Sequence, residues 1–162
     1  MKRLALVAVA ILGFGVAGCG SSSSTSPSAS NITVFTVPLS ALNEVPPITN
    51  AEATARGTAV ITVNKGTNAI DFNVSLNTFP AGSAVNVAHI HKAPAGQTAG
   101  VLIGTGLTAG TVTLTDGFGT FSFQQVTSSE ANITDIIANP QNYYFNVHTT
   151  LNGGGAIRGQ LK

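Results

Sequence analysis

The sequence predicts an all-β fold, an antiparallel β-sandwich with one short helix before the penultimate strand. The chain is rich in Val, Ile, Thr, Phe and Gly, a composition typical of β-domains. Several segments alternate apolar and polar residues, and residues that favour turns separate them. Antiparallel pairs of this kind leave one apolar face that a second layer has to cover, so we expect two packed layers.

The first predicted hairpin spans residues 57–76, GTAVITVNKGTNAIDFNVSL, with its turn at NKGTN. Its second arm shows the clearest alternation, because four apolar residues share one face and polar residues fill the other. The apolar residues are Ile70, Phe72, Val74 and Leu76. This pattern indicates a strand with one face buried.

Two further strand pairs are predicted toward the C-terminus. Residues 110–126 contain Asp116-Gly117 between alternating runs, which is a strong hairpin signal. Residues 142–162, NYYFNVHTTLNGGGAIRGQLK, predict a last pair joined by a glycine-rich loop. The stretch between them, NITDIIANP, predicts the helix, with Asn132 as its N-cap and Pro140 ending it.

The N-terminus has the features of a lipoprotein export signal. Lys2 and Arg3 precede an apolar run too short for a membrane span, and the stretch ends in VAGC, which resembles a lipobox. We therefore expect a signal peptide at residues 1–18, a lipidated Cys19 that begins a serine-rich tether at residues 19–30, and a domain at residues 31–162. The expected location is the outer membrane or cell surface, facing the periplasm if the organism has two membranes, with the lipid as the contact to the membrane.

The charge and cysteine content excludes several classes of function. The chain has a formal net charge of +1 and no cluster of basic residues interleaved with aromatic ones, so nucleic acid is not expected as a partner. Its single cysteine is the predicted lipid acceptor, so neither a disulfide nor a thiolate metal ligand is expected. No nucleophile elbow or phosphate-binding loop is found, which argues against an enzyme of those classes.

The three histidines are the candidate metal ligands. His89 and His91 are two residues apart on a predicted strand and share one face, and His148 lies on the polar face of a later strand. Three neutral imidazoles suit copper or zinc. Two questions stay open: whether a bulge near Ala88 turns the first pair away from the core, and whether the histidines only bond backbone groups and order the loops.

Four unusual strings together resemble the CHRD (chordin) domain family. They are Glu44-Val45-Pro46-Pro47, His89-Ile90-His91, Asn146-Val147-His148-Thr149 and Ile157-Arg158-Gly159-Gln160-Leu161. The resemblance runs from about Val37 to the C-terminus and implies an immunoglobulin-like β-sandwich. It implies little about activity, because bacterial members mostly lack an assigned one. Lys92 and Ala156 depart from the family pattern, which often has Gly and Glu at these two positions.

Glu44 and Arg158 are predicted to form a structural ion pair, because a guanidinium can hold a carboxylate with two hydrogen bonds. Binding of an anionic ligand by Arg158 is the alternative. Taken together, the sequence favours a lipid-anchored, non-catalytic module that binds a protein or cell-surface ligand. The competing hypothesis is a single-site copper or zinc protein that uses His89, His91 and His148.

Overall fold

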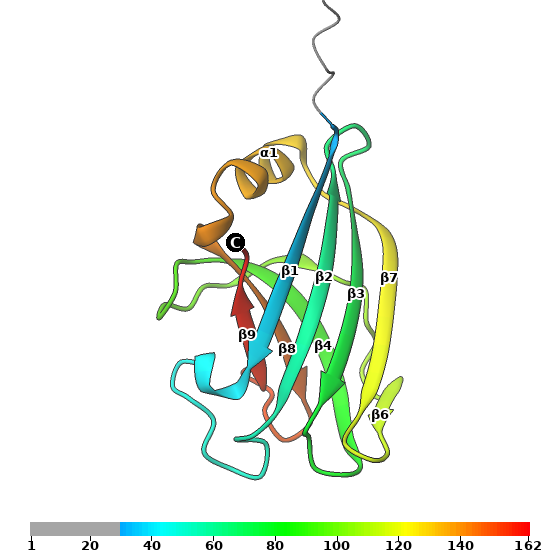
Figure 1. Cartoon of the computed structure of the whole chain (residues 1–162), viewed down its shortest axis with the longest axis vertical. Helices are drawn as coiled ribbons and strands as arrows, with labels where there is room; N and C mark the ends of the chain where they lie inside the picture. Colours follow the sequence, from blue (N-terminus) through cyan, green and yellow to red (C-terminus); the bar gives the residue numbers. More distant parts are fainter. Residues whose placement is uncertain (1–29) are drawn as a thin grey trace, which may run out of the picture.

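The computed structural model describes residues 30–162, which form an all-β domain made from one strongly curled sheet (Figure 1). The predicted signal peptide, Cys19 and most of the tether lie outside the described residues. None of the helices described at residues 30–162 has the length and apolar character to cross a bilayer. The elements in chain order are β1 (Ile32–Ser40), η1 (Ala41–Asn43), β2 (Arg56–Asn64), β3 (Ala69–Asn77), β4 (Ser83–Lys92), β5 (Val101–Gly104), β6 (Val112–Leu114), β7 (Gly119–Thr127), α1 (Glu130–Ala138), η2 (Pro140–Asn142), β8 (Tyr143–Thr149) and β9 (Ile157–Gln160).

The sheet has the strand order β5-β4-β8-β9-β1-β2-β3-β7, and β6 pairs with β4 beside this path. It folds over itself at the junction of β1 and β9, which share the single residue pair Ser40–Arg158. The strands β1, β2, β3 and β7 therefore face β4, β8 and β9 as a second layer (Figure 1). Between the layers Phe72 of β3 stacks on Phe145 of β8, with 5.6 Å between ring centroids. The predicted sandwich-like arrangement of two layers is confirmed.

The alternation of apolar residues predicts two of the three strand pairs correctly. β2 and β3 pair antiparallel over their whole length, and Ile70, Phe72, Val74 and Leu76 are all buried as expected. β8 and β9 pair antiparallel across the glycine-rich loop. These pairs form where strands adjacent in the chain can meet through a short connection.

The hairpin predicted for residues 110–126 is wrong. A turn does form there, because the Gly117 amide donates to the Leu114 carbonyl at 3.1 Å. However, β6 pairs with β4 and β7 pairs with β3, so this turn links the two layers. Its position is fixed by Phe79, whose amide donates to the Gly117 carbonyl at 3.2 Å. The short β6 pairs with the first residues of β4, from Ser83 to Val85, whereas β7 pairs with β3 between Ala69 and Leu76.

The helix α1 forms where predicted but begins three residues earlier. Its N-cap is Ser129, not Asn132, and the Ser129 hydroxyl accepts the Asn132 amide at 3.2 Å. The helix ends at Ala138, just before Pro140. Ile133 and Ile136 are buried in the core, and α1 lies at one end of the curled sheet (Figure 1). The helix then directs the chain into β8.

Candidate metal centre

A bulge in β4 turns His89 and His91 away from the core. The pairing of β4 with β8 shifts by one residue between Val85 and Val87, so Ala88 and Ile90 take over the core positions from Val85. The two histidines then lie on the opposite face of the sheet. Of the two orientations that the sequence left open, the structure shows the outward one.

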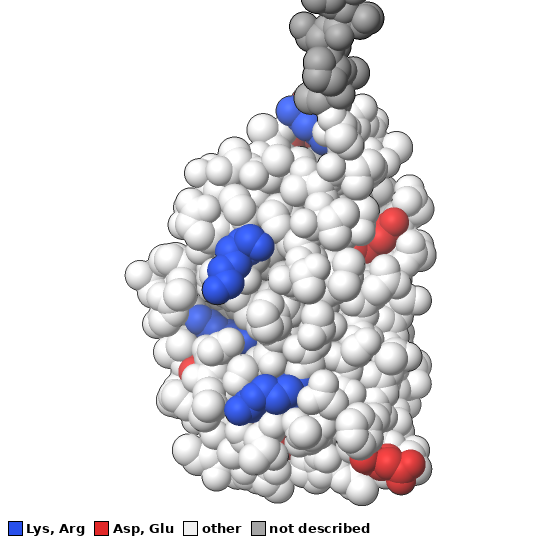
Figure 2. Space-filling model, in the orientation of Figure 1, with Lys and Arg blue, Asp and Glu red and all other residues white. Residues whose placement is uncertain are grey.

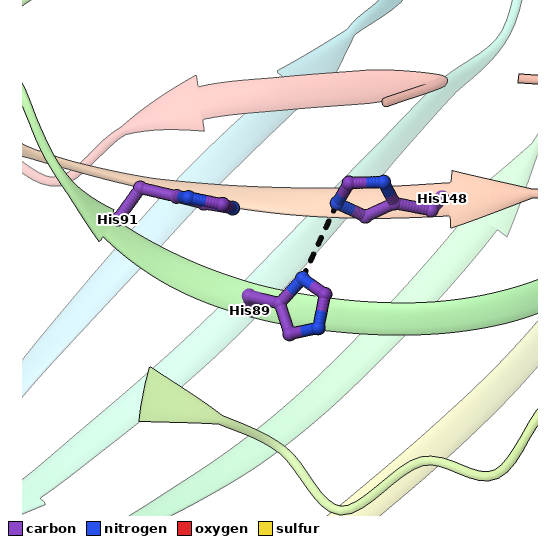
Figure 3. A group of neighbouring side chains, drawn as sticks. All are labelled: His89, His91 and His148. Carbon is purple, nitrogen blue, oxygen red and sulfur yellow. Dashed lines mark hydrogen bonds between the residues drawn. The ribbon is translucent and has the colours of Figure 1, made fainter. Parts of the chain in front are cut away.

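β8 brings the third histidine to the same face. Val87 pairs with His148 and His89 with Asn146, so the side chains of His89 and His148 are diagonal neighbours on adjacent strands. The three imidazoles converge from the two strands (Figure 3). One ring nitrogen from each lies within 4.8 Å of the other two. The structure therefore joins three residues that are up to 59 positions apart in the chain.

Backbone carbonyls fix the tautomers of two histidines. Nδ1 of His91 lies 3.0 Å from the Ala99 carbonyl, and Nδ1 of His148 lies 3.0 Å from the Gly153 carbonyl. A carbonyl only accepts hydrogen bonds, so each Nδ1 carries the proton and each Nε2 keeps its lone pair. Orientation of an imidazole by a hydrogen bond from its second nitrogen is the usual arrangement of metal-binding histidines.

The lone pairs of these histidines point into the cluster. Nδ1 of His89 lies 3.3 Å from Nε2 of His148, and a dashed line marks this contact in Figure 3. Because Nε2 of His148 is an acceptor, Nδ1 of His89 donates in this contact. Nε2 of His91 is buried and has no hydrogen-bond partner. The cluster thus contains an acceptor that no described protein group satisfies.

The imidazoles are kept neutral by their surroundings. Burial, together with His148 and His91, lowers the pKa of His89 to about 4. Burial also lowers the pKa of His91 and of His148, although the bonds to carbonyls at residues 99, 100 and 153 act in the opposite direction. The free energy of protonating any of them is therefore less favourable than in water. A neutral imidazole is the form that binds a metal.

The rest of this face is polar and buried. The ring of Tyr144 lies parallel to His91 at 4.7 Å between centroids, and the guanidinium of Arg158 lies 4.1 Å from the centroid of the same ring. Asn146 pairs with both His89 and Arg158 across the strands and is only 3 % exposed. Its Oδ1 has no partner. The sequence motifs do not single out Tyr144 and Asn146 as parts of the site, although both lie on the polar face of the His148 strand.

The predicted ion pair of Glu44 and Arg158 is not formed. Among residues 30–162 the only ion pair is Lys92–Asp135. Nη1 of Arg158 instead donates to the Gln97 carbonyl at 2.9 Å, while Oε1 of Glu44 is buried without a partner. Burial raises the pKa of Glu44 to about 7, and the charge of Arg158 opposes this rise. The guanidinium therefore influences the carboxyl without a direct contact, because Tyr144 and the Gln97 carbonyl hold it elsewhere.

The comparisons with known proteins give one match. The model of the CHRD domain family matches residues 35–161. No curated protein and no solved structure matches the chain. The match covers most of the 162 residues and includes all three histidines, Glu44 and Arg158. The chain therefore belongs to the CHRD domain family.

Proposed function

We propose that the domain binds one copper or zinc ion through Nδ1 of His89 and Nε2 of His91 and His148. Its family membership fits a binding module, and the histidine cluster specifies what one site in that module can hold. The unpartnered Nε2 of His91 carries the proposal. If the histidines served only to order loops, the Nδ1 bonds to Ala99 and Gly153 would be explained, but a buried acceptor would still be left unsatisfied, at a cost of about 1–3 kcal/mol.

The geometry supports an ion with tetrahedral coordination. Ligand atoms 2.0–2.1 Å from such an ion are separated by about 3.3 Å. The His89–His148 pair already has this separation, at 3.3 Å, and the other pairs lie within 4.8 Å. The His91 side chain would have to move toward the other two when the ion binds. The ion would replace the proton shared by His89 and His148, and His89 would then carry its proton on Nε2.

Three protein ligands leave a fourth position for a water molecule or an external ligand. No described carboxylate joins the three histidines in the cluster. The site therefore resembles an open metal site more than a closed structural one. The chemistry of the donors, three imidazole nitrogens, suits both copper and zinc, so both ions belong in the test.

The test combines metal content with thermal stability of the purified full-length chain. We expect one ion per chain by elemental analysis, and a melting temperature that rises on adding Cu²⁺ or Zn²⁺ to the metal-free protein. A ligand present at 100 times its Kd stabilises the folded state by about 2.7 kcal/mol. His148→Ala should abolish both responses as completely as His89→Ala.

Thr150→Ala is the matched control, because Thr150 is exposed and follows His148 just beyond the end of β8. It should leave the metal response intact. A wild-type melting temperature that neither ion changes would refute the metal site. So would a His148→Ala protein that still carries one ion.

We further propose that the domain is attached to a membrane through lipid on Cys19. The support is the position of the single cysteine after an apolar export signal. Cys19→Ser should no longer be labelled by a palmitate analogue in cells, whereas Ser21→Ala, two residues away, should be labelled like the wild type. Equal labelling of Cys19→Ser and the wild type would contradict the anchor.

A further inference from the structure

A groove lies beside the metal centre on the side of β9. It is formed by the end of β1, by η1, by β9 and by the loop near Gly96, and its volume is about 760 Å³. Pockets that enclose small organic ligands have volumes of roughly 300–1,000 Å³. The groove is therefore large enough for a ligand of several rings, and none of the three histidines lines it.

Most of the basic residues of the domain line this groove. The chain has seven Lys and Arg residues, and two of them, Lys2 and Arg3, precede the described part. Of the remaining five, three line the groove: Arg56, Arg158 and Lys162. Figure 2 shows basic side chains gathered over β1 and β9, while the larger acidic patches lie at the opposite edge. This distribution attracts an anionic ligand.

The floor of the groove contains polar groups that are already held in place. Arg158 is 2 % exposed and is fixed by the Tyr144 ring and the Gln97 carbonyl. Glu44 is 7 % exposed, and its Oε1 has no partner. A buried acceptor without a partner points to a missing donor. Since the pKa of Glu44 is raised to about 7, much of this carboxyl is uncharged at neutral pH and repels an anion less.

The rim adds apolar surface. Leu42 is 61 % exposed and Val45 is 41 % exposed, and both line the groove together with Pro47. A ligand that fits these observations carries a negative charge that the basic residues attract and a hydroxyl that donates to Glu44. It also has C–H groups that can pack against the apolar side chains of the rim. A sugar ring that carries a carboxylate has all three.

We propose that the groove binds a carboxylated sugar, either free or as a unit of an acidic polysaccharide. Its carboxylate would lie against Arg56 and Lys162, and one of its hydroxyls would donate to Oε1 of Glu44. None of the three histidines lines the groove, so sugar binding does not depend on whether the histidines bind a metal. Such binding would hold the domain against hydroxyl-rich, anionic surface material.

The experiment measures binding of galacturonic acid and of its trimer to the full-length protein by titration calorimetry at low and high salt. We expect both to bind, the trimer more tightly if a polysaccharide is the source of the ligand and equally if the free sugar acid is. Affinity should fall as salt rises, because exposed charges are screened. The neutral galactose trimer should bind at least about tenfold more weakly, which corresponds to the loss of one charge-assisted contact.

Matched variants locate the site. Arg56→Ala and Glu44→Leu should each weaken trimer binding about tenfold, whereas Lys65→Ala, which removes the same charge far from the groove, should not change it. His148→Ala should also keep full sugar binding, so failure of the metal proposal leaves this one intact. Hexaglutamate, an acidic peptide, is titrated under the same conditions as a competitor class of ligand. The proposal is overturned if the galacturonic acid trimer does not bind, if the neutral trimer binds equally well, or if hexaglutamate binds more tightly.

Discussion

The two faces of β8 meet different neighbours, although all seven of its residues are buried. One face presents Tyr143, Phe145 and Val147, which pack into the core between the two layers. The other presents Tyr144, Asn146 and His148, which lie under loops. Apolar groups on the first face satisfy one another by contact, whereas polar groups on the second need partners.

The second face does not supply all of those partners. Four buried side-chain atoms of the described residues lack a hydrogen bond, and three of them belong to this region: Oε1 of Glu44, Nε2 of His91 and Oδ1 of Asn146. Unsatisfied groups reduce the stability of the folded state and persist where something else compensates. The two faces of β8 therefore show that burial alone does not distinguish the core from the candidate site. Buried donors and acceptors without hydrogen-bond partners distinguish them.

The largest expected effect lies on the core face. Phe145 is fully buried and stacks on Phe72, so Phe145→Ala should lower the free energy of unfolding by about 3–5 kcal/mol. Denaturant titration measures this, with and without added Zn²⁺. The loss should be the same in both conditions, because the core face contains no ligand. A loss below about 1 kcal/mol would mean that the two layers do not pack as described.

The second largest effect is expected at two buried carboxyl groups, one without and one with hydrogen-bond partners. Glu44 has no partner for Oε1, whereas Oε2 of Glu52 accepts from Thr149 Oγ1 at 2.7 Å and from Asn152 Nδ2 at 2.6 Å. The folded pKa of Glu44, about 7, lies above its usual value of 4.5. The folded state therefore holds the proton more tightly than the unfolded state, and this contribution to stability is lost as the pH rises from about 4.5 to about 7.

Gln does not ionise, so Glu44→Gln removes the loss of stability that accompanies ionisation of Glu44. The variant should raise the free energy of unfolding at pH 8 by about 2 kcal/mol, with little change at pH 4. Glu52→Gln should act in the opposite direction, because a neutral amide oxygen accepts weaker hydrogen bonds from Thr149 and Asn152 than a carboxylate oxygen does. Denaturant titrations of both variants across pH 4–8 provide the measurement. The interpretation of Glu44 fails if its variant loses stability at pH 8.

The sequence predicts the strands better than it predicts their partners. Alternation is a local property, so Ile70–Leu76 and the Tyr144–His148 face are read correctly from a few residues. The choice of partner depends on contacts across the chain, which is why Asp116-Gly117 predicts a hairpin that does not form. Ser and Asn are both good N-cap residues, so residue type alone does not show that the helix begins after Ser129 and not after Asn132.

The site is predictable to a similar extent. The His-x-His spacing and the polar face of β8 nominate the three histidines, but one residue inserted before Val87 decides which way two of them point. The carbonyls of Ala99 and Gly153 carry no signal in the residue type, because every residue has one. Opposite charges suggest a Glu44–Arg158 pair, yet the Tyr144 ring takes the guanidinium.

The smallest expected effect tests how the polar face holds the His91 ring. The Tyr144 hydroxyl accepts the Ala99 amide at 3.4 Å, and the Ala99 carbonyl in turn accepts from Nδ1 of His91. Tyr144→Phe removes this long hydrogen bond but keeps the ring between His91 and Arg158, so stability should fall by only about 0.5 kcal/mol. Metal affinity should fall a fewfold, because the backbone of Ala99, whose carbonyl orients His91, becomes less fixed. Tyr144→Leu, which also removes the ring, should weaken both properties further. If Tyr144→Phe costs as much as Tyr144→Leu, then the hydroxyl and not the stacked ring holds this face together.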